Sequence, residues 1–157
     1  MLRTGRELGL SETDLVHARR GALLHDVGLT RVPESILEKS GKLTESEWEI
    51  MRLHPVYGYE MLQHIPALYP AIDIPYCHHE RWNGSGYPRG IEGTEIPLSA
   101  RIFAVADGWI ALCSHRPYRS EISPQEASTV VSDASGSLFD PQVLEVFLGV
   151  VRDADAA

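Results

Sequence analysis

Apolar residues recur every three or four positions in several segments of this chain, and residues that commonly start helices precede these segments. Ser11 precedes apolar residues at positions 15, 18 and 22, and Thr44 precedes a second series that begins at Trp48. Thr44 with Glu47 forms a capping-box pattern, in which each side chain bonds the backbone amide of the other. No segment competes with the strict alternation that strands require. The pattern predicts an all-α fold.

The same signals set approximate bounds for each helix. Pro55 lies inside the second long series and should kink or split it, because proline lacks the amide hydrogen that a helix interior needs. Four glycines between positions 83 and 94 predict a loop there. The predicted helices cover residues 11–28, 33–37, 44–62, 71–79 and 97–112, a segment from 123 onward, and 140–150.

Composition restricts the class of protein. The chain has 157 residues with 43% hydrophobic and 23% charged residues, which suits one globular domain covering 1–157. A formal charge of −8 argues against a broad nucleic-acid surface. The sequence has no apolar run of membrane-spanning length and no signal-peptide pattern. Cys77 and Cys113 are too few for a disulfide framework, so we expect reduced thiols in a cytoplasmic protein.

The segment His78-His79-Glu80 holds two adjacent imidazoles followed by an acid. Two neighbouring histidines are difficult to satisfy in an apolar core, since each ring nitrogen needs a partner, and a shared metal ion would provide one. A surface loop that happens to carry two histidines is the simpler alternative.

Further candidate ligands favour the metal interpretation. His25-Asp26 ends an apolar helical segment, His54 precedes a proline, and Asp107 lies in an otherwise apolar run where a carboxylate needs a partner. Imidazole and carboxylate together suit iron, manganese, zinc or nickel, and no cysteine spacing supports a structural zinc site. We interpret His17, His64 and His115 as non-ligands, with His17 on the surface.

These residues follow the order and spacing of the HD-GYP family. The resemblance covers about residues 10–150 and rests on the following segments: His25-Asp26, His54-Pro55, His78-His79-Glu80, Gly86-Tyr87-Pro88, Asp107 and Ser114–Arg119. It implies a helical HD-domain bundle from a bacterial protein, and a metal-dependent phosphodiesterase that hydrolyses cyclic di-GMP. Such domains often follow a sensor or receiver domain in the same chain.

The resemblance also implies roles for individual residues. Asp26 would bridge two divalent metal ions, with His54, His78 and His79 on one ion and His25 and Asp107 on the other. Asp26 and His25 are therefore the candidate catalytic residues. The candidate substrate-binding residues are Gly86, Tyr87, Pro88, Arg116 and Arg119, with Tyr87 directed to a guanine and the arginines to phosphate.

The chain departs from the family pattern at several positions. Leu29 stands where the family has a lysine, Asn83 where it usually has aspartate, and Ile110 where it usually has a second aspartate. We expect Leu29 and Ile110 to face each other, an apolar contact replacing an ion pair. The family also supplies a ligand histidine from an earlier helix, so the domain looks as if it lacks its first helix or helices. Fewer than two metals and association into a homodimer are the expected consequences.

Two alternative functions remain open at this point. The first is a degenerate, non-catalytic HD-GYP module that binds cyclic di-GMP or a protein partner in signalling. The second is a related His-Asp phosphohydrolase that acts on another nucleotide, although Gly86-Tyr87-Pro88 argues against it.

Overall fold

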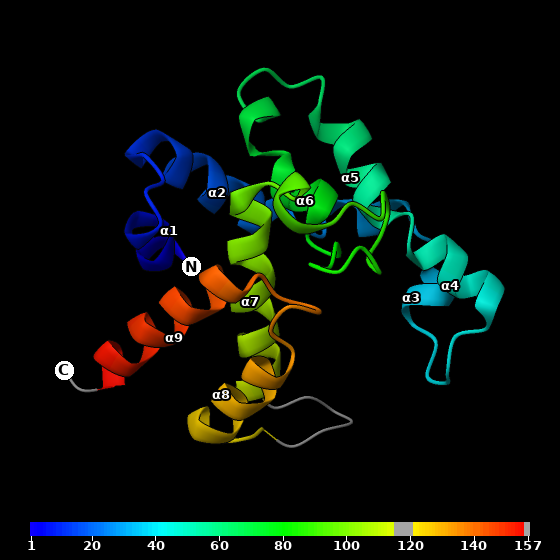
Figure 1. Cartoon of the computed structure of the whole chain (residues 1–157). Helices are drawn as coiled ribbons and strands as arrows, with labels where there is room; N and C mark the ends of the chain where they lie inside the picture. The colour runs from blue at the N-terminus through cyan, green and yellow to red at the C-terminus, as the bar shows by residue number, and fades with distance from the viewer. Residues whose placement is uncertain (115–120, 156–157) are drawn as a thin grey trace.

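The architecture is a bundle of α-helices joined by short 3₁₀ turns, as seen in a computed structural model that describes residues 1–114 and 121–155 (Figure 1). The described part contains isolated bridge pairing between Ser135 and Phe139 but no strand, so the predicted all-α class is confirmed. The α-helices are α1 (Leu2–Glu7), α2 (Glu12–Leu24), α3 (Glu34–Leu37), α4 (Glu45–Met51), α5 (His54–Leu62), α6 (Asp73–Cys77), α7 (Leu98–Cys113), α8 (Pro124–Asp133) and α9 (Pro141–Asp155). The 3₁₀ turns are η1 (Val27–Arg31), η2 (Tyr69–Ala71) and η3 (Gly93–Glu95).

Helix α7 is central and packs on both sides. On one side it contributes to the largest apolar cluster, together with α8 and α9 (Figure 1). On the other side Phe103 of α7 packs with Ala18 of α2 and Ile74 of α6. Because the second cluster lies directly behind the histidines of α2 and α6, α7 is the support on which the candidate site is built. The buried members of the first cluster are Ile102, Val105, Ala106, Val131, Val143, Leu144 and Phe147.

Helix starts follow the capping signals in the sequence. Ser11, Thr44 and Ser123 are the N-caps of α2, α4 and α8, and each forms a complete capping box with the acid three positions later. Each box satisfies amide hydrogens that the first turn of a helix leaves without partners. These local bonds fix where the helices begin.

Some predicted bounds were wrong. The segment predicted as one helix over 71–79 is the turn η2 followed by the short helix α6, because Pro70 and Pro75 interrupt the amide donors of a regular helix. The first long helix ends at Leu24 and not near Gly28. Pro55 does divide the series 44–62, into α4 and α5.

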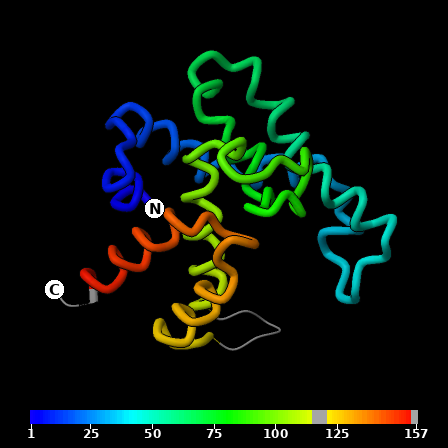
Figure 2. Tube along the Cα trace, viewed as in Figure 1, coloured from blue at the N-terminus to red at the C-terminus, as the bar shows by residue number. Residues whose placement is uncertain are grey.

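The segment from η1 to α4 extends to the side of the molecule away from α9 (Figure 2). It is held at Gly28, where an added Cβ would lie 1.9 Å from the backbone oxygen of His54 and 2.6 Å from the amide nitrogen of Gly58. Only glycine permits this close approach of η1 to α5. The contact brings Asp26, just before η1, next to His54 at the start of α5.

None of the helices in the described part of the chain combines the length and apolar character needed to cross a membrane.

Candidate metal centre

Four histidines lie together because helices end or begin at them. His25 is the C-cap of α2, His54 is the first residue of α5, and His78 is the C-cap of α6 with His79 directly after it. His54 and His78 are almost fully buried, at 3% and 7% exposure. Buried imidazoles need defined partners for both ring nitrogens.

Backbone carbonyls fix one nitrogen of three of these rings. Nδ1 of His25 lies 2.8 Å from the oxygen of Ala22, and Nδ1 of His54 lies 2.8 Å from the oxygen of Met51. Nδ1 of His78 lies 3.1 Å from the oxygens of both Ile74 and Pro75. A carbonyl oxygen only accepts, so Nδ1 carries the hydrogen in each ring. In the neutral rings Nε2 then presents a lone pair, which is the form that binds metals.

These Nε2 atoms converge around the carboxylate of Asp26. Nε2 of His54 and Nε2 of His78 are 3.1 Å apart, and they lie 3.5 and 3.6 Å from Oδ1 of Asp26. Nε2 of His25 lies 3.1 Å from Oδ2 of the same carboxylate. Asp26 thus turns one oxygen toward His54 and His78 and the other toward His25.

The donor set fits a divalent metal ion. Ligand atoms of His54, His78 and His79 all lie within 4.8 Å of one another. Two Nε2 lone pairs 3.1 Å apart repel each other unless a cation or a proton lies between them. Burial of the rings disfavours the proton, whereas three imidazoles and a carboxylate suit a transition metal.

The pKa values of these groups show the same electrostatic pattern. Hydrogen bonding to His25, followed by His78, holds the pKa of Asp26 well below its usual range, so Asp26 is a carboxylate at neutral pH. The bond to Asp26 raises the pKa of His25. Loss of solvent lowers the pKa of His54, and it lowers the pKa of His79 to about 3. His54 and His79 are therefore neutral, as metal ligands must be.

Asp107 is placed differently from the buried carboxylate that the sequence suggested. Its side chain is exposed on α7, one turn beyond Phe103, whose ring centroid lies 4.9 Å from that of His25. The negative charge of Asp107 is one of the causes that raise the pKa of His25. Asp107 therefore lies on the His25 side of the cluster and needs no buried partner, because this face of α7 is open to solvent.

The loop after His79 places the Gly86-Tyr87-Pro88 segment over the cluster. The amide of Tyr87 donates to the oxygen of His79 at 3.2 Å, and the Tyr87 ring stacks on the His79 ring at 4.7 Å with 23° between the planes. An added Cβ on Gly86 would lie 2.4 Å from the amide nitrogen of Arg81, so glycine is required for this close turn. The half-buried Tyr87 thus borders the candidate metal centre.

The arginines around this loop include two that the sequence analysis missed. The predicted phosphate ligands Arg116 and Arg119 lie outside the described residues. The charges of Arg52 and Arg81 lower the pKa of Tyr87, against the larger effect of burial that raises it. Both exposed guanidinium groups are therefore near the Tyr87 phenol. Their positions in the sequence, two residues before His54 and two after His79, could have identified them as neighbours of the site.

The departures from the family pattern differ in their surroundings. Ile110 is 60% exposed, and Leu29 is partly buried in η1, so the expected apolar pairing of these residues receives no support from burial. Asn83 accepts hydrogen bonds from the amide and the hydroxyl of Ser85 at 3.0 and 2.7 Å. Asn83 thus stabilises the turn that leads to Gly86, a role that needs only an acceptor oxygen.

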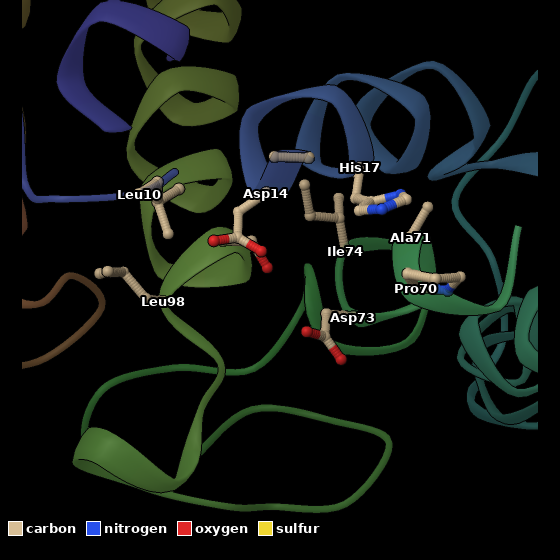
Figure 3. A pocket seen from close by; sticks show the side chains of 10 residues that line it. Leu10, Asp14, His17, Pro70, Ala71, Asp73, Ile74 and Leu98 are labelled. Carbon is tan, nitrogen blue, oxygen red and sulfur yellow. The ribbon is translucent and has the colours of Figure 1, made fainter. Parts of the chain in front are cut away.

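His17 lies apart from the cluster. It is half-buried and not on the open surface, and it lines a separate cavity of about 150 Å³ with Asp14 and Asp73 (Figure 3). The group of histidines with metal-ligand spacing does not include it. The prediction that His17 is no ligand of the centre agrees with this position. His64 is exposed, and His115 lies outside the described residues.

An all-α bundle in which four histidines, two of them buried, surround the carboxylate of Asp26 is the arrangement expected of an HD-type metal-dependent phosphohydrolase. A sequence model of the family described as HD domain matches residues 1–143. The chain belongs to this family, and the resemblance to the HD-GYP proteins is confirmed by its relatives.

The relatives are bacterial phosphodiesterases of cyclic dinucleotides. A cyclic di-GMP phosphodiesterase of Thermotoga maritima is 41% identical over 153 residues, covering 96% of this chain and 42% of the relative. The cyclic di-GMP phosphodiesterase response regulator RpfG of Xanthomonas campestris is 43% identical over 144 residues, covering 90% and 38%. A 3'3'-cGAMP-specific phosphodiesterase of Vibrio cholerae is 37% identical over 137 residues, covering 87% and 30%.

A crystal structure described as a cyclic GMP-AMP-specific phosphodiesterase of V. cholerae has the same fold. It matches with a TM-score of 0.69 and 22% identity, covering 96% of this chain and 41% of that chain. The chain thus spans less than half the length of the relatives it matches.

Proposed function

We propose that this chain is a metal-dependent phosphodiesterase that hydrolyses cyclic di-GMP. The observation that carries the proposal is the convergence of the Nε2 atoms of His54 and His78, 3.1 Å apart, on the ionised carboxylate of Asp26. Relatives of about 40% identity that bear this activity in their names support the substrate class.

Two divalent ions, from iron, manganese, zinc or nickel, fit the proposed ligand set. His54, His78 and His79 would hold one ion, His25 and Asp107 the other, and Asp26 would lie between them. Divalent ions at such a site lower the pKa of a bound water and neutralise charge on the attacked phosphate. Because the Asp107 carboxylate is exposed, the second ion is the more weakly held of the two, and a single ion per chain is the alternative.

The residues of the chain then have distinct roles. Asp26 remains ionised and orients His25 through the 3.1 Å contact. Gly86, Tyr87 and Pro88 form the edge against which a guanine rests. Arg116 and Arg119 are proposed to bind phosphate oxygens, which suits the planar guanidinium group.

A second cyclic dinucleotide, 3'3'-cGAMP, is also a candidate substrate. Relatives named as 3'3'-cGAMP-specific phosphodiesterases match at 37–38% identity, close to the values for the cyclic di-GMP enzymes. Leu29 in place of the family lysine favours slow turnover, and a module that only binds the nucleotide or a protein partner is the competing function.

We also propose the wider setting of the domain. Relatives more than twice as long support an attached sensor or receiver domain in a cytoplasmic signalling protein. Leu23 on α2 and Ile110 on α7 are 77% and 60% exposed, and exposed apolar side chains of this size favour a homodimer or a covering segment.

The test combines metal analysis with a product assay on one preparation. Metal content is measured by elemental analysis on protein purified without chelator, and hydrolysis of cyclic di-GMP and 3'3'-cGAMP is followed by chromatography with manganese or ferrous iron. We expect His78→Ala to lose metal and hydrolysis together, whereas the exposed His64→Ala retains both. Wild-type protein that binds metal but forms no product at high protein concentration would contradict the proposed enzymatic activity and favour a module that only binds the nucleotide or a protein partner.

A further inference from the structure

Glu80 is a buried carboxylate that the proposed metal centre does not use. It follows His79 directly and is only 4% exposed. Its Oε1 accepts a hydrogen bond from the amide of Arg89 at 2.7 Å, nine positions along the chain. Glu80 therefore closes the loop that contains Tyr87 by joining its first residue to the residue after Pro88.

The loop has few other internal bonds near Tyr87. The amide of Tyr87 donates to the oxygen of His79 at 3.2 Å. The other bonds of the loop lie before Gly86, where the amide of Gly84 donates to the oxygen of Arg81 and Asn83 accepts from Ser85. Beyond Gly86, the turn that stacks Tyr87 on His79 is therefore held by the bond of the Tyr87 amide to His79 and by the bond of the Arg89 amide to Glu80.

The second oxygen of Glu80 has no such bond to the described residues. Oε2 is buried and has no hydrogen-bond donor within the described part of the chain. Glu80 lines a small cavity with Arg101, whose guanidinium group already donates to the oxygen of Ile96 and to Asp140. Arg101 has further N–H donors, so one water between it and Oε2 would satisfy the carboxylate.

Glu80 is not placed as a metal ligand, although it adjoins two of them. The residues that offer ligand atoms within 4.8 Å of one another, among those described, are His54, His78 and His79. One Glu80 oxygen is bonded to Arg89, and Glu80 lines the Arg101 cavity, which contains none of these histidines.

We infer that Glu80 is a positioning residue: by bonding the amide of Arg89 it holds Tyr87 against His79, where Tyr87 meets the nucleotide. The inference deepens the proposed function and rests on it for the role of Tyr87. A buried carboxylate is costly unless it makes such bonds, so its presence here is explained by the loop that it orders.

The main test is kinetic. Glu80→Ala should lower kcat/KM for cyclic di-GMP about 10- to 100-fold, since small displacements of a substrate-positioning group have effects of this order. We expect the loss mainly as a higher KM, with metal content unchanged. Glu80→Gln keeps an acceptor for the Arg89 amide and should recover most of the loss. Glu95→Ala, which removes an exposed carboxylate of η3, the turn that follows this loop, is the matched control and should act as wild type.

A double variant separates positioning from general damage. If Glu80 acts through Tyr87, Glu80→Ala should have little further effect on kcat/KM in a Tyr87→Ala background. Independent, additive losses, or a loss of metal in Glu80→Ala, would overturn the inference.

Amide hydrogen exchange keeps the test independent of turnover. The Arg89 and Tyr87 amides should exchange at least about tenfold faster in Glu80→Ala than in wild type. The Arg89 amide loses its acceptor, and the Tyr87 amide lies in a turn that is no longer held closed. Unchanged exchange at both amides refutes the positioning role even if the wild type is active. Faster exchange in a wild type that is inactive on both nucleotides leaves the loop contact standing and rejects only the proposed function.

Discussion

A buried ion pair between Arg101 and Asp140 joins the central helix to the start of α9. Nη1 of Arg101 lies 2.6 Å from Oδ2 of Asp140, and Asp140 is only 3% exposed. The other oxygen of Asp140 accepts from the amides of Gln142 and Val143 at 2.8 and 3.3 Å, as an N-cap does. Asp140→Ala therefore removes the counter-charge of Arg101 and the cap of α9 together.

The expected magnitude follows from the burial of Asp140 and the partial burial of Arg101. Removing one member of a buried pair leaves the other charge uncompensated and typically costs about 3–5 kcal/mol. This cost is larger than the roughly 1 kcal/mol that the loss of a helix cap alone would cause. For a domain of this size each kcal/mol lowers the Tm by about 2–4 °C, so we expect a decrease of roughly 6–20 °C.

Denaturant unfolding followed by circular dichroism measures the loss directly. Glu12→Ala breaks the Arg6–Glu12 pair, which has a similar 2.8 Å contact but is exposed, and it should change the free energy of unfolding far less. Arg101→Met combined with Asp140→Ala should recover part of the stability, because no unpaired charge remains. If Asp140→Ala costs no more than Glu12→Ala, the reasoning from burial is refuted.

Three further predictions concern packing, pH and reactivity. Gly28→Ala should lower both stability and metal content, because the added Cβ would lie 1.9 Å from a backbone oxygen of α5; thermal unfolding and elemental analysis measure these. Hydrogen bonding to Lys39 lowers the pKa of Glu47 to about 2. The stability contributed by Glu47 is therefore complete above its usual pKa near 4.5 and is lost as the pH falls toward 2. Glu47→Gln should reduce the loss of stability at acid pH, as denaturant unfolding at a series of pH values can measure. Burial raises the pKa of Cys77 to about 12, so iodoacetamide at about pH 8 should label Cys113 and leave Cys77 unmodified in native protein, as mass spectrometry can show.

Local signals allowed much of the helical order to be predicted from the sequence. The capping boxes at Ser11, Thr44 and Ser123 lie within four residues of the amides that they bond, so their effect is readable without knowledge of the fold. The break between α4 and α5 at Pro55 is equally local. The helix predicted over 71–79 was too long, because Pro70 and Pro75 lack the amide hydrogens that a regular helix needs.

The site was predictable in residue type but not in distance. His25, Asp26, His54 and His78 were expected to meet, and their side chains do lie together. The exposure of Asp107 was not predictable, because whether a helix face is covered depends on which distant helix packs against it. The same holds for the pair Arg101–Asp140, whose members are 39 positions apart.

The way in which the chain orients its imidazoles connects the local and the long-range levels. His25, His54 and His78 each bond a carbonyl three positions earlier, and these carbonyls belong to the last turns of α2, α4 and α6. The last carbonyls of a helix have no partner within the helix, so a histidine just past the end can satisfy one while turning its Nε2 outward. Helix C-termini also carry partial negative charge, which favours a cation nearby. Three helices that end close together therefore fix the histidine tautomers and supply the negative electrostatic potential that a metal ion requires. For this reason short, interrupted helices suit the site better than the longer helices that were predicted.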